Sequence, residues 1–167
     1  HIISSASIVG PKEGEGPLGE FFDLISQDAG FGEENWEKAE STLQKEALSV
    51  AAGKAKLSPW QIRYLFGGDL LAQLSATSFG TEESNLPFFG LYGACSTCGE
   101  SLTLAAMAVA GGFADYAAAI TSSHLGSAEK EFRFPLAYGN QRPLSATWTV
   151  TGSGAFILAA QGGYVKI

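Results

Sequence analysis

The sequence is poor in charged residues and in cysteine, and both shortages limit what it can be. Charged residues make up 16% of the 167 residues and hydrophobic residues 46%, a balance that supports a packed core and excludes an intrinsically disordered chain. Two cysteines cannot form a disulfide framework, so a reducing compartment is expected. No apolar run reaches the roughly 18 residues that a membrane-spanning helix needs.

Positive charge is also scarce. Ten Lys and Arg residues oppose 17 Asp and Glu residues, which gives a formal net charge of -7. Proteins that bind nucleic acid need clustered positive charge to displace counterions from phosphates, so nucleic acid is excluded as a partner. The length fits one domain, or half of a larger one. The chain opens with His1 and stops in an alternating segment at residues 162–167, so we expect the complete protein to be longer.

Strand-like apolar runs alternate with segments of helical periodicity. Strands are expected at residues 2–9, 62–66, 88–94 and 115–121, and helices at residues 36–53, 70–76 and 101–110. The last helix is apolar on nearly every side, which predicts a buried helix. This order predicts an α/β fold, βαβαβαββ, with a mixed, mostly parallel, five-stranded sheet and helices on both faces.

Two further segments follow the fourth strand. Residues 122–143 form a long polar connection, and a loop of that length inside a compact domain is usually functional. Residues 147–151 and 155–160 flank Gly152, Ser153 and Gly154, which predicts an antiparallel hairpin.

Cys95 lies between a predicted strand and the predicted buried helix. In such sheets ligands bind beyond the carboxyl ends of the strands, where helix N-termini present free N–H groups and a positive dipole. The small neighbours Gly93, Ala94 and Ser96 permit a tight turn that would lift the Cys95 side chain into a cleft. A helix terminus lowers the pKa of a thiol and burial raises it, so the sequence leaves the protonation state of Cys95 open.

Three interpretations of Cys95 compete. It is a buried structural cysteine, a redox or zinc residue together with Cys98, or a residue of a pocket with a binding or nucleophilic role. Zinc needs four ligands, and only His1 and His124 remain in the sequence to complete the set. The strand-to-helix elbow favours the pocket, and no metal and no cofactor are expected.

The elbow resembles the thiolase superfamily, in which Ala-Cys and two small residues ahead of a buried helix contain the acyl-accepting cysteine. Longer motifs over nearly the whole chain resemble one thiolase-like family of endospore formers, the stage V sporulation protein AD (SpoVAD) family. These motifs are Gly10-Pro11-Lys12-Glu13, Gly16-Pro17-Leu18-Gly19, Asn35-Trp36-Glu37-Lys38-Ala39-Glu40, Gly68-Asp69-Leu70-Leu71, Gly93-Ala94-Cys95-Ser96-Thr97, Ser122-Ser123-His124, Ala128-Glu129-Lys130-Glu131-Phe132-Arg133-Phe134-Pro135 and Thr149-Val150-Thr151-Gly152-Ser153-Gly154-Ala155.

The resemblance implies a protein of the dipicolinic acid uptake system, which binds pyridine-2,6-dicarboxylate and passes it to membrane partners of the same sporulation stage. It implies a protein located in the cytoplasm of the mother cell or forespore and held peripherally on the spore inner membrane through those partners. Family members have two similar halves, so residues 1–167 are expected to form the N-terminal thiolase-like domain. By analogy with thiolase-like sheets, a homodimer is expected.

A rigid aromatic dianion needs N–H donors, a guanidinium group and a flat apolar wall. The candidate ligand-binding residues are Cys95, Ser96, Thr97, His124, Arg133, Arg142 and Asp69. Each has a plainer alternative: each Arg pairs with an acidic neighbour such as Glu129 or Glu131, His124 is a structural or surface histidine, and Asp69 caps a helix that starts at Leu70.

Three functions remain open at this point, and with them the question of whether the protein is an enzyme. The first is non-catalytic dipicolinate binding on a thiolase fold. The second is an acyl transferase of the thiolase or ketoacyl-synthase type with Cys95 as its nucleophile, for which only His124 is a local candidate base. The third is a structural role in assembling membrane partners, with a vestigial pocket.

Overall fold

The computed structural model describes residues 1–133, 135, 143–163 and 165–167. Along the chain the elements are β1 (Ile2–Val9), α1 (Pro11–Gly14), η1 (Gly19–Phe21), β2 (Leu24–Ile25), α2 (Trp36–Lys54), η2 (Pro59–Gln61), β3 (Tyr64–Gly68), η3 (Ala72–Leu74), α3 (Ser75–Glu82), β4 (Phe88–Gly90), η4 (Ala94–Ser96), α4 (Thr97–Ala110), β5 (Tyr116–Ser123), α5 (Leu125–Phe132) and β6 (Gly152–Ala159). The α/β class predicted from the sequence is confirmed.

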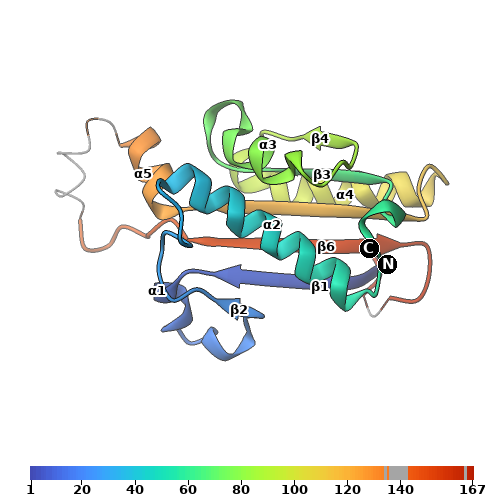
Figure 1. Ribbon diagram of the computed structural model, residues 1–167, viewed down its shortest axis with the longest axis horizontal. Helices are drawn as coiled ribbons and strands as arrows, with labels where there is room; N and C mark the ends of the chain where they lie inside the picture. The colour runs from blue at the N-terminus through green and yellow to red at the C-terminus, as the bar shows by residue number, and fades with distance from the viewer. Residues whose placement is uncertain (134, 136–142, 164) are drawn as a thin grey trace.

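One mixed sheet organises the molecule, with the strand order β2-β1-β6-β5-β3-β4. In the described part of the chain it has six strands, not the five predicted. The two-residue strand β2 was not predicted because it is too short for its alternation to be recognised, and one strand, β6, replaces the two predicted at residues 147–151 and 155–160. β6 is antiparallel to both β1 and β5, whereas the other pairs are parallel, so five strands end at the same edge of the sheet. We call this edge the carboxyl edge; in Figure 1 it lies on the left, where α1 and α5 are found.

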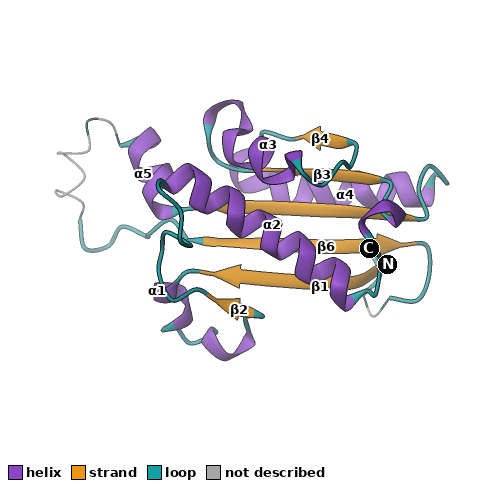
Figure 2. Cartoon of the chain, viewed as in Figure 1, coloured by secondary structure: helices purple, strands orange, loops and turns teal. Residues whose placement is uncertain are grey.

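Helices cover both faces of the sheet, as predicted (Figure 2). On one face α2 packs Leu43, Ala47 and Ala51 against buried sheet residues such as Ile120 and Ile157. On the other face α4 packs Ala105 and Val109 against β3, β5 and β6. Fully burying a leucine or valine side chain such as Leu43 or Val109 contributes roughly 1.5–3 kcal/mol, so these two layers supply the main stabilisation of the sheet.

The N-terminus of α2 confirms the helix predicted for residues 36–53. Asn35 has an extended backbone, and its side chain accepts a hydrogen bond from the Lys38 backbone N–H at 2.8 Å. This is the usual role of an asparagine at the position before a helix.

The hairpin predicted around residues 152–154 is wrong. These three residues lie inside β6, a single strand in the middle of the sheet, and the structure has no strand at residues 147–151. Ser153 is paired with Ile8 of β1 on one side and with Ser122 of β5 on the other. Backbone hydrogen bonds on both sides therefore hold in a strand a glycine-rich segment that would form a turn if it stood alone.

Three other predictions also need correction. The helix expected at residues 70–76 is η3 followed by α3, because Gln73 and Leu74 have left-handed backbones with φ of 60° and 53°. The polar connection 122–143 is partly helical, since α5 occupies Leu125–Phe132. The helix predicted to be buried, α4, leaves Met107 62% exposed, so the described residues cover only one of its faces.

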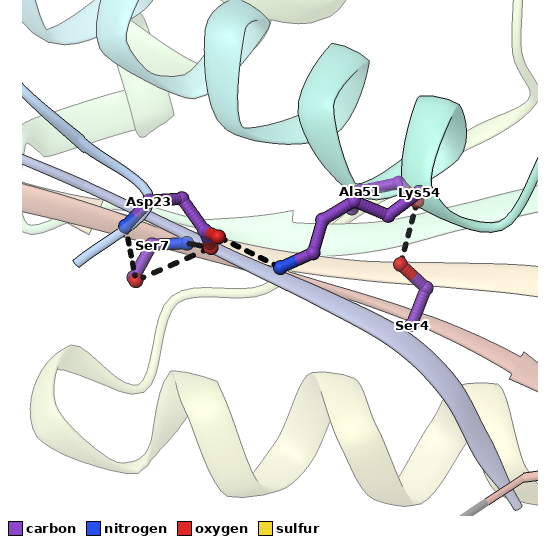
Figure 3. A network of polar contacts seen from close by, with 5 residues as sticks. All are labelled: Ser4, Ser7, Asp23, Ala51 and Lys54. Carbon is purple, nitrogen blue, oxygen red and sulfur yellow. Dashed lines mark hydrogen bonds and ion pairs between the residues drawn. The ribbon is translucent and has the colours of Figure 1, made fainter. Parts of the chain in front are cut away.

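A polar cluster ties β1 to the end of α2 (Figure 3). Ser4 Oγ donates to the Ala51 carbonyl at 2.7 Å, and Lys54 Nζ lies 2.7 Å from Asp23 Oδ1. The Ser7 backbone N–H donates to the other Asp23 oxygen at 2.9 Å. Burial alone would raise the pKa of Asp23, but the hydrogen bonds from Lys54 and Ser7 outweigh it and hold that pKa below its ordinary value.

Candidate functional site

The carboxyl edge brings three of the predicted site residues to the ends of neighbouring strands. His124 follows β5, Asp69 follows β3, and Cys95 lies beyond β4, and these strands are adjacent in the order β5-β3-β4. Ligands of open α/β sheets bind at such an edge. The three side chains nevertheless have different surroundings.

The elbow at Cys95 is built on a left-handed residue and a glycine. Ala94, the first residue of η4, has a φ of 50°, which turns the chain sharply ahead of α4. A Cβ atom at Gly93 would lie 2.3 Å from Ser96 Oγ, so this position has no room for a side chain while Ser96 donates to the Gly93 carbonyl. Thr97 Oγ1 accepts a hydrogen bond from the Gly93 backbone N–H at 3.0 Å, which closes the turn.

Cys95 is exposed, so it is not a buried core cysteine of this chain. It borders a shallow depression of about 620 Å³ that is also lined by Ser96, Gly99, Glu100, Thr103 and Leu104. The backbone N–H groups of Ser96 and Thr97 are already bonded to the carbonyls of Gly93 and Ala94 within η4. These two N–H groups are therefore not the free donors that the sequence predicted.

Thr97 positions the elbow and does not face the depression, because it is buried and its hydroxyl serves the Gly93 backbone. We expect Thr97→Val to lower the free energy of unfolding by about 1–2 kcal/mol, since it leaves a backbone N–H without an acceptor. The matched control is Thr103→Val, on the exposed side of the same helix. Urea unfolding of both variants checks this; equal effects would contradict the assigned role of Thr97.

Asp69 is buried and acts as a cap. Its Oδ1 accepts from the Leu71 backbone N–H at 2.7 Å, and its Oδ2 accepts from the backbone N–H and the hydroxyl of Thr77, at 2.7 and 2.5 Å. Asp69 thus holds the turn between β3 and α3, and the residue as a whole is 2% exposed. The capping alternative describes this residue, although the helix it serves begins at Ser75 rather than Leu70.

His124 is buried and both of its ring nitrogens are occupied. The Gly126 backbone N–H donates to Nδ1 at 3.0 Å, which caps α5, and Nε2 donates to the Ala29 carbonyl at 2.7 Å. The ring also stacks on Trp36 with a centroid distance of 5.3 Å. With both nitrogens bonded to backbone groups, His124 in this arrangement is a structural residue rather than a base directed at Cys95.

Arg133 does not line the depression in this structure. Arg133 follows α5, and its Nε forms an ion pair with Glu129, which is the salt-bridge alternative given above. Arg142 lies outside the described residues. Among the described residues, the only charged one that lines the depression is Glu100, which is hydrogen-bonded to Ser96.

A set of buried polar residues behind the carboxyl edge was missed by the sequence analysis. Glu40 and Gln44, one turn apart on α2, are fully buried among apolar neighbours. Together with Asp69, Thr77, Ser122 and Ser127 they form a continuous series of hydrogen bonds, which we call the buried polar chain. The available signal was the position of Glu40 and Gln44, which flank Leu43 on the face of α2 that the apolar spacing predicts to be buried.

Glu40 is the most perturbed titratable group of the buried polar chain. Burial raises the pKa of Glu40 to about 7 because it disfavours the charged form. Hydrogen bonds from Ser122 and Ser127 oppose this rise, whereas the negative charges of Asp69 and Glu37 add to it. Glu37 has the opposite behaviour: its hydrogen bond with Lys130 holds its pKa below the ordinary value.

Comparison with known sequences identifies one family. The sequence profile of stage V sporulation protein AD (SpoVAD) matches residues 1–167. The stage V sporulation protein AD of Bacillus subtilis (strain 168) is 42% identical to this chain over 166 residues, which is 99% of this chain and 49% of that protein. The chain therefore spans about half the length of the curated relative it matches.

Comparison with solved structures shows the fold. OleA H285N from Xanthomonas campestris superimposes with a TM-score of 0.63 at 16% identity, covering 95% of this chain and 55% of that one. The 3-oxoacyl-(acyl carrier protein) synthase III, FabH, of Xanthomonas oryzae pv. oryzae gives 0.61 at 17% identity, with the same coverage. A tetronic acid condensing enzyme, AbyA1, gives 0.60 at 15% identity over 98% of this chain and 50% of that one.

Proposed function

Because the chain belongs to the stage V sporulation protein AD family, we propose that it forms one half of a dipicolinic acid binding protein of the spore uptake machinery. The ligand is pyridine-2,6-dicarboxylate, and the site is the elbow at Cys95. The observation that supports this most is the exposure of Cys95 at the carboxyl edge, beside an open depression. Binding, and not turnover, is the proposed activity.

The chemistry of the ligand indicates what the rest of the protein adds. A planar dianion requires cationic partners, and the depression is bordered by Glu100 and by no cation among the described residues. We propose that the remaining half of the protein supplies the cations and packs over the uncovered face of α4, where Met107 is exposed. Two similar halves packed together are what the family resemblance implies.

We propose that the protein acts at the spore inner membrane through membrane partners of the same sporulation stage. Among the residues that the structure describes, no helix is long and apolar enough to cross a membrane. Contact with the membrane in this proposal therefore rests on protein partners.

A homodimer is part of the same proposal. β4 is the last strand of the sheet and pairs only with β3 among the described residues, so its other edge has unpaired backbone groups. Phe89 on this strand is 50% exposed. An antiparallel contact with β4 of a second copy would satisfy these groups and cover that side chain.

Titration calorimetry of the full-length protein with dipicolinate tests the proposal. We expect saturable binding by the unaltered protein and binding weakened by roughly tenfold in Cys95→Ala, since the thiol borders the depression. Cys98→Ala is the matched control, because Cys98 does not line the depression, and it should bind like the unaltered protein. Absence of any heat change would contradict the proposal and favour a purely structural role.

The same protein also tests the acyl transferase alternative. The exposure of Cys95 favours this alternative, and the occupied nitrogens of His124 disfavour it. After incubation with acyl-CoA between pH 6 and 9, mass spectrometry should find no acyl adduct on Cys95. A covalent adduct that Cys95→Ala abolishes would replace the binding function with acyl transfer.

A further inference from the structure

The directions of four hydrogen bonds in the buried polar chain follow from one amide. Gln44 Nε2 lies 2.9 Å from Thr77 Oγ1 and 2.5 Å from Ser122 Oγ, so it donates one hydrogen to each hydroxyl. Each hydroxyl then donates its own hydrogen to a carboxylate, Thr77 to Asp69 at 2.5 Å and Ser122 to Glu40 at 2.7 Å. The buried polar chain thus joins two buried carboxyl groups, those of Asp69 and Glu40, and each accepts a hydrogen bond from a hydroxyl of the chain.

The second oxygen of Glu40 permits two arrangements of hydrogens. Glu40 Oε2 lies 2.8 Å from Ser127 Oγ, and the same hydroxyl lies 3.1 Å from the His124 carbonyl. When Glu40 is ionised, Ser127 donates to it. When Glu40 is protonated, its O–H donates to Ser127, which then donates to the His124 carbonyl. In both forms the Glu40 carboxyl group and the Ser127 hydroxyl are hydrogen-bonded with no movement of heavier atoms, and burying a polar group costs least when it is bonded in this way.

The charges around Glu40 favour the protonated form. Asp69, from the turn after β3, and Glu37, from α2 itself, both act against a negative charge on Glu40. The neighbouring cation on α5, Lys130, forms an ion pair with Glu37. The electrostatic interaction of His124 is likewise with Glu37, whose pKa it helps to lower. In the described part of the chain no cation is bonded to Glu40, so a proton is the group that neutralises it.

We propose that Glu40 is a reversible proton-binding site of the folded protein and that its charge is coupled, through Ser122, Gln44 and Thr77, to Asp69. The raised pKa of Glu40, about 7, places the titration near neutrality. The buried polar chain ends at Ser127, in the first turn of α5, and at Asp69, in the β3–α3 junction. Both ends lie at the carboxyl edge. Dipicolinate binding at this edge, which rests on the proposed function, would then depend on pH through Glu40, a residue that does not touch the ligand.

Infrared spectroscopy of the full-length protein tests the proposal, because a protonated carboxyl group has a C=O band that the ionised group lacks. We expect one such band to disappear with a midpoint near pH 7 and to be absent from Glu40→Gln. In Ser122→Ala the midpoint should rise by roughly one pH unit, since the ionised form loses one hydrogen-bond donor. In NMR spectra the backbone amide resonances of Leu71 and Thr77 should shift with the same pH midpoint as the infrared band, because both N–H groups donate to Asp69.

The matched control is Ser123→Ala, the next residue of β5, whose hydroxyl donates to the Val150 carbonyl. It should leave the midpoint unchanged. Should Ser122→Ala fail to fold, Ser127→Ala removes the other donor and is expected to raise the midpoint in the same way. The proposal is overturned if no band that Glu40→Gln removes titrates between pH 5 and 9, or if Ser123→Ala and Ser122→Ala shift it equally. Amide signals that do not follow the band would overturn the coupling to Asp69.

Discussion

Gly68→Ala is expected to lower the free energy of unfolding by about 3 kcal/mol, the upper range of overpacking changes. Gly68 ends β3, and a Cβ atom added to it would lie 2.0 Å from the Leu91 carbonyl oxygen. This neighbour is backbone, and the Leu91 N–H is itself bonded to Gly67 at 2.8 Å. The clash can be relieved only by separating β3 from the segment that leads to Cys95.

Urea unfolding of the full chain measures this effect. The matched control is Gly53→Ala, near the end of α2, where an added Cβ atom meets nothing within 4 Å. Alanine at such a helical position should stabilise the protein by about 0.5–1 kcal/mol. A Gly68→Ala variant as stable as the unaltered protein would mean that β3 and the Leu91 segment do not approach each other as described.

Glu40→Gln is expected to make the protein more stable at pH 8 while leaving its stability at pH 4 unchanged. The pKa of Glu40 rises from 4.5 to about 7 on folding, so the folded protein binds a proton that the unfolded chain releases. The stabilising contribution of this proton on Glu40 is fully present below about pH 4.5 and is lost as the pH rises towards 7. A shift of this size corresponds to about 3 kcal/mol.

Glutamine reproduces the protonated form of Glu40 at every pH. Its carbonyl accepts from Ser122, and its amide donates to Ser127, which turns to the His124 carbonyl. The unfolding free energies of Glu40→Gln and of the unaltered protein, measured at several pH values, should therefore differ by an amount that grows from pH 4.5 to 7. Glu37→Gln, on the same helix, is the control, and it should gain nothing at pH 8 because Glu37 pairs with Lys130. Parallel stability curves for Glu40→Gln and the unaltered protein would contradict the raised pKa.

The long, regular elements of the fold were predictable from the sequence. β1 matches its predicted bounds, and α2 ends one residue beyond the predicted position 53, because each has a clear period and a clear boundary such as Asn35. The elbow was predictable as well, since small residues precede and follow Cys95 between a strand and a helix. Its exposure was not, because burial depends on which elements lie over it.

The errors have physical causes that one chain segment does not reveal. Gly152 and Gly154 lie in a strand because β1 and β5 bond to both of its sides. α5 was missed because a histidine side chain caps it, and histidine is not among the usual capping residues. The late start of α3 follows from two left-handed residues without a glycine, Gln73 and Leu74.

Of the candidate site residues, the structure leaves Cys95 and Ser96 at the depression and assigns other contacts to Thr97, His124, Asp69 and Arg133. Residue type alone could not separate these roles, since an exposed histidine and a capping histidine look the same in a sequence. The buried polar chain was also hidden, because its members come from four separate segments. Only the packing of α2 on the sheet brings Glu40 within reach of Ser122 and Ser127.

The most direct measurement is a crystal structure of the full-length protein soaked with dipicolinate. The proposed function predicts density for the pyridine ring within contact distance of the Cys95 sulfur, with cations of the second half on its carboxylates. A ligand bound only at a surface remote from residue 95, or a filled elbow that leaves no space beside the thiol, would contradict it.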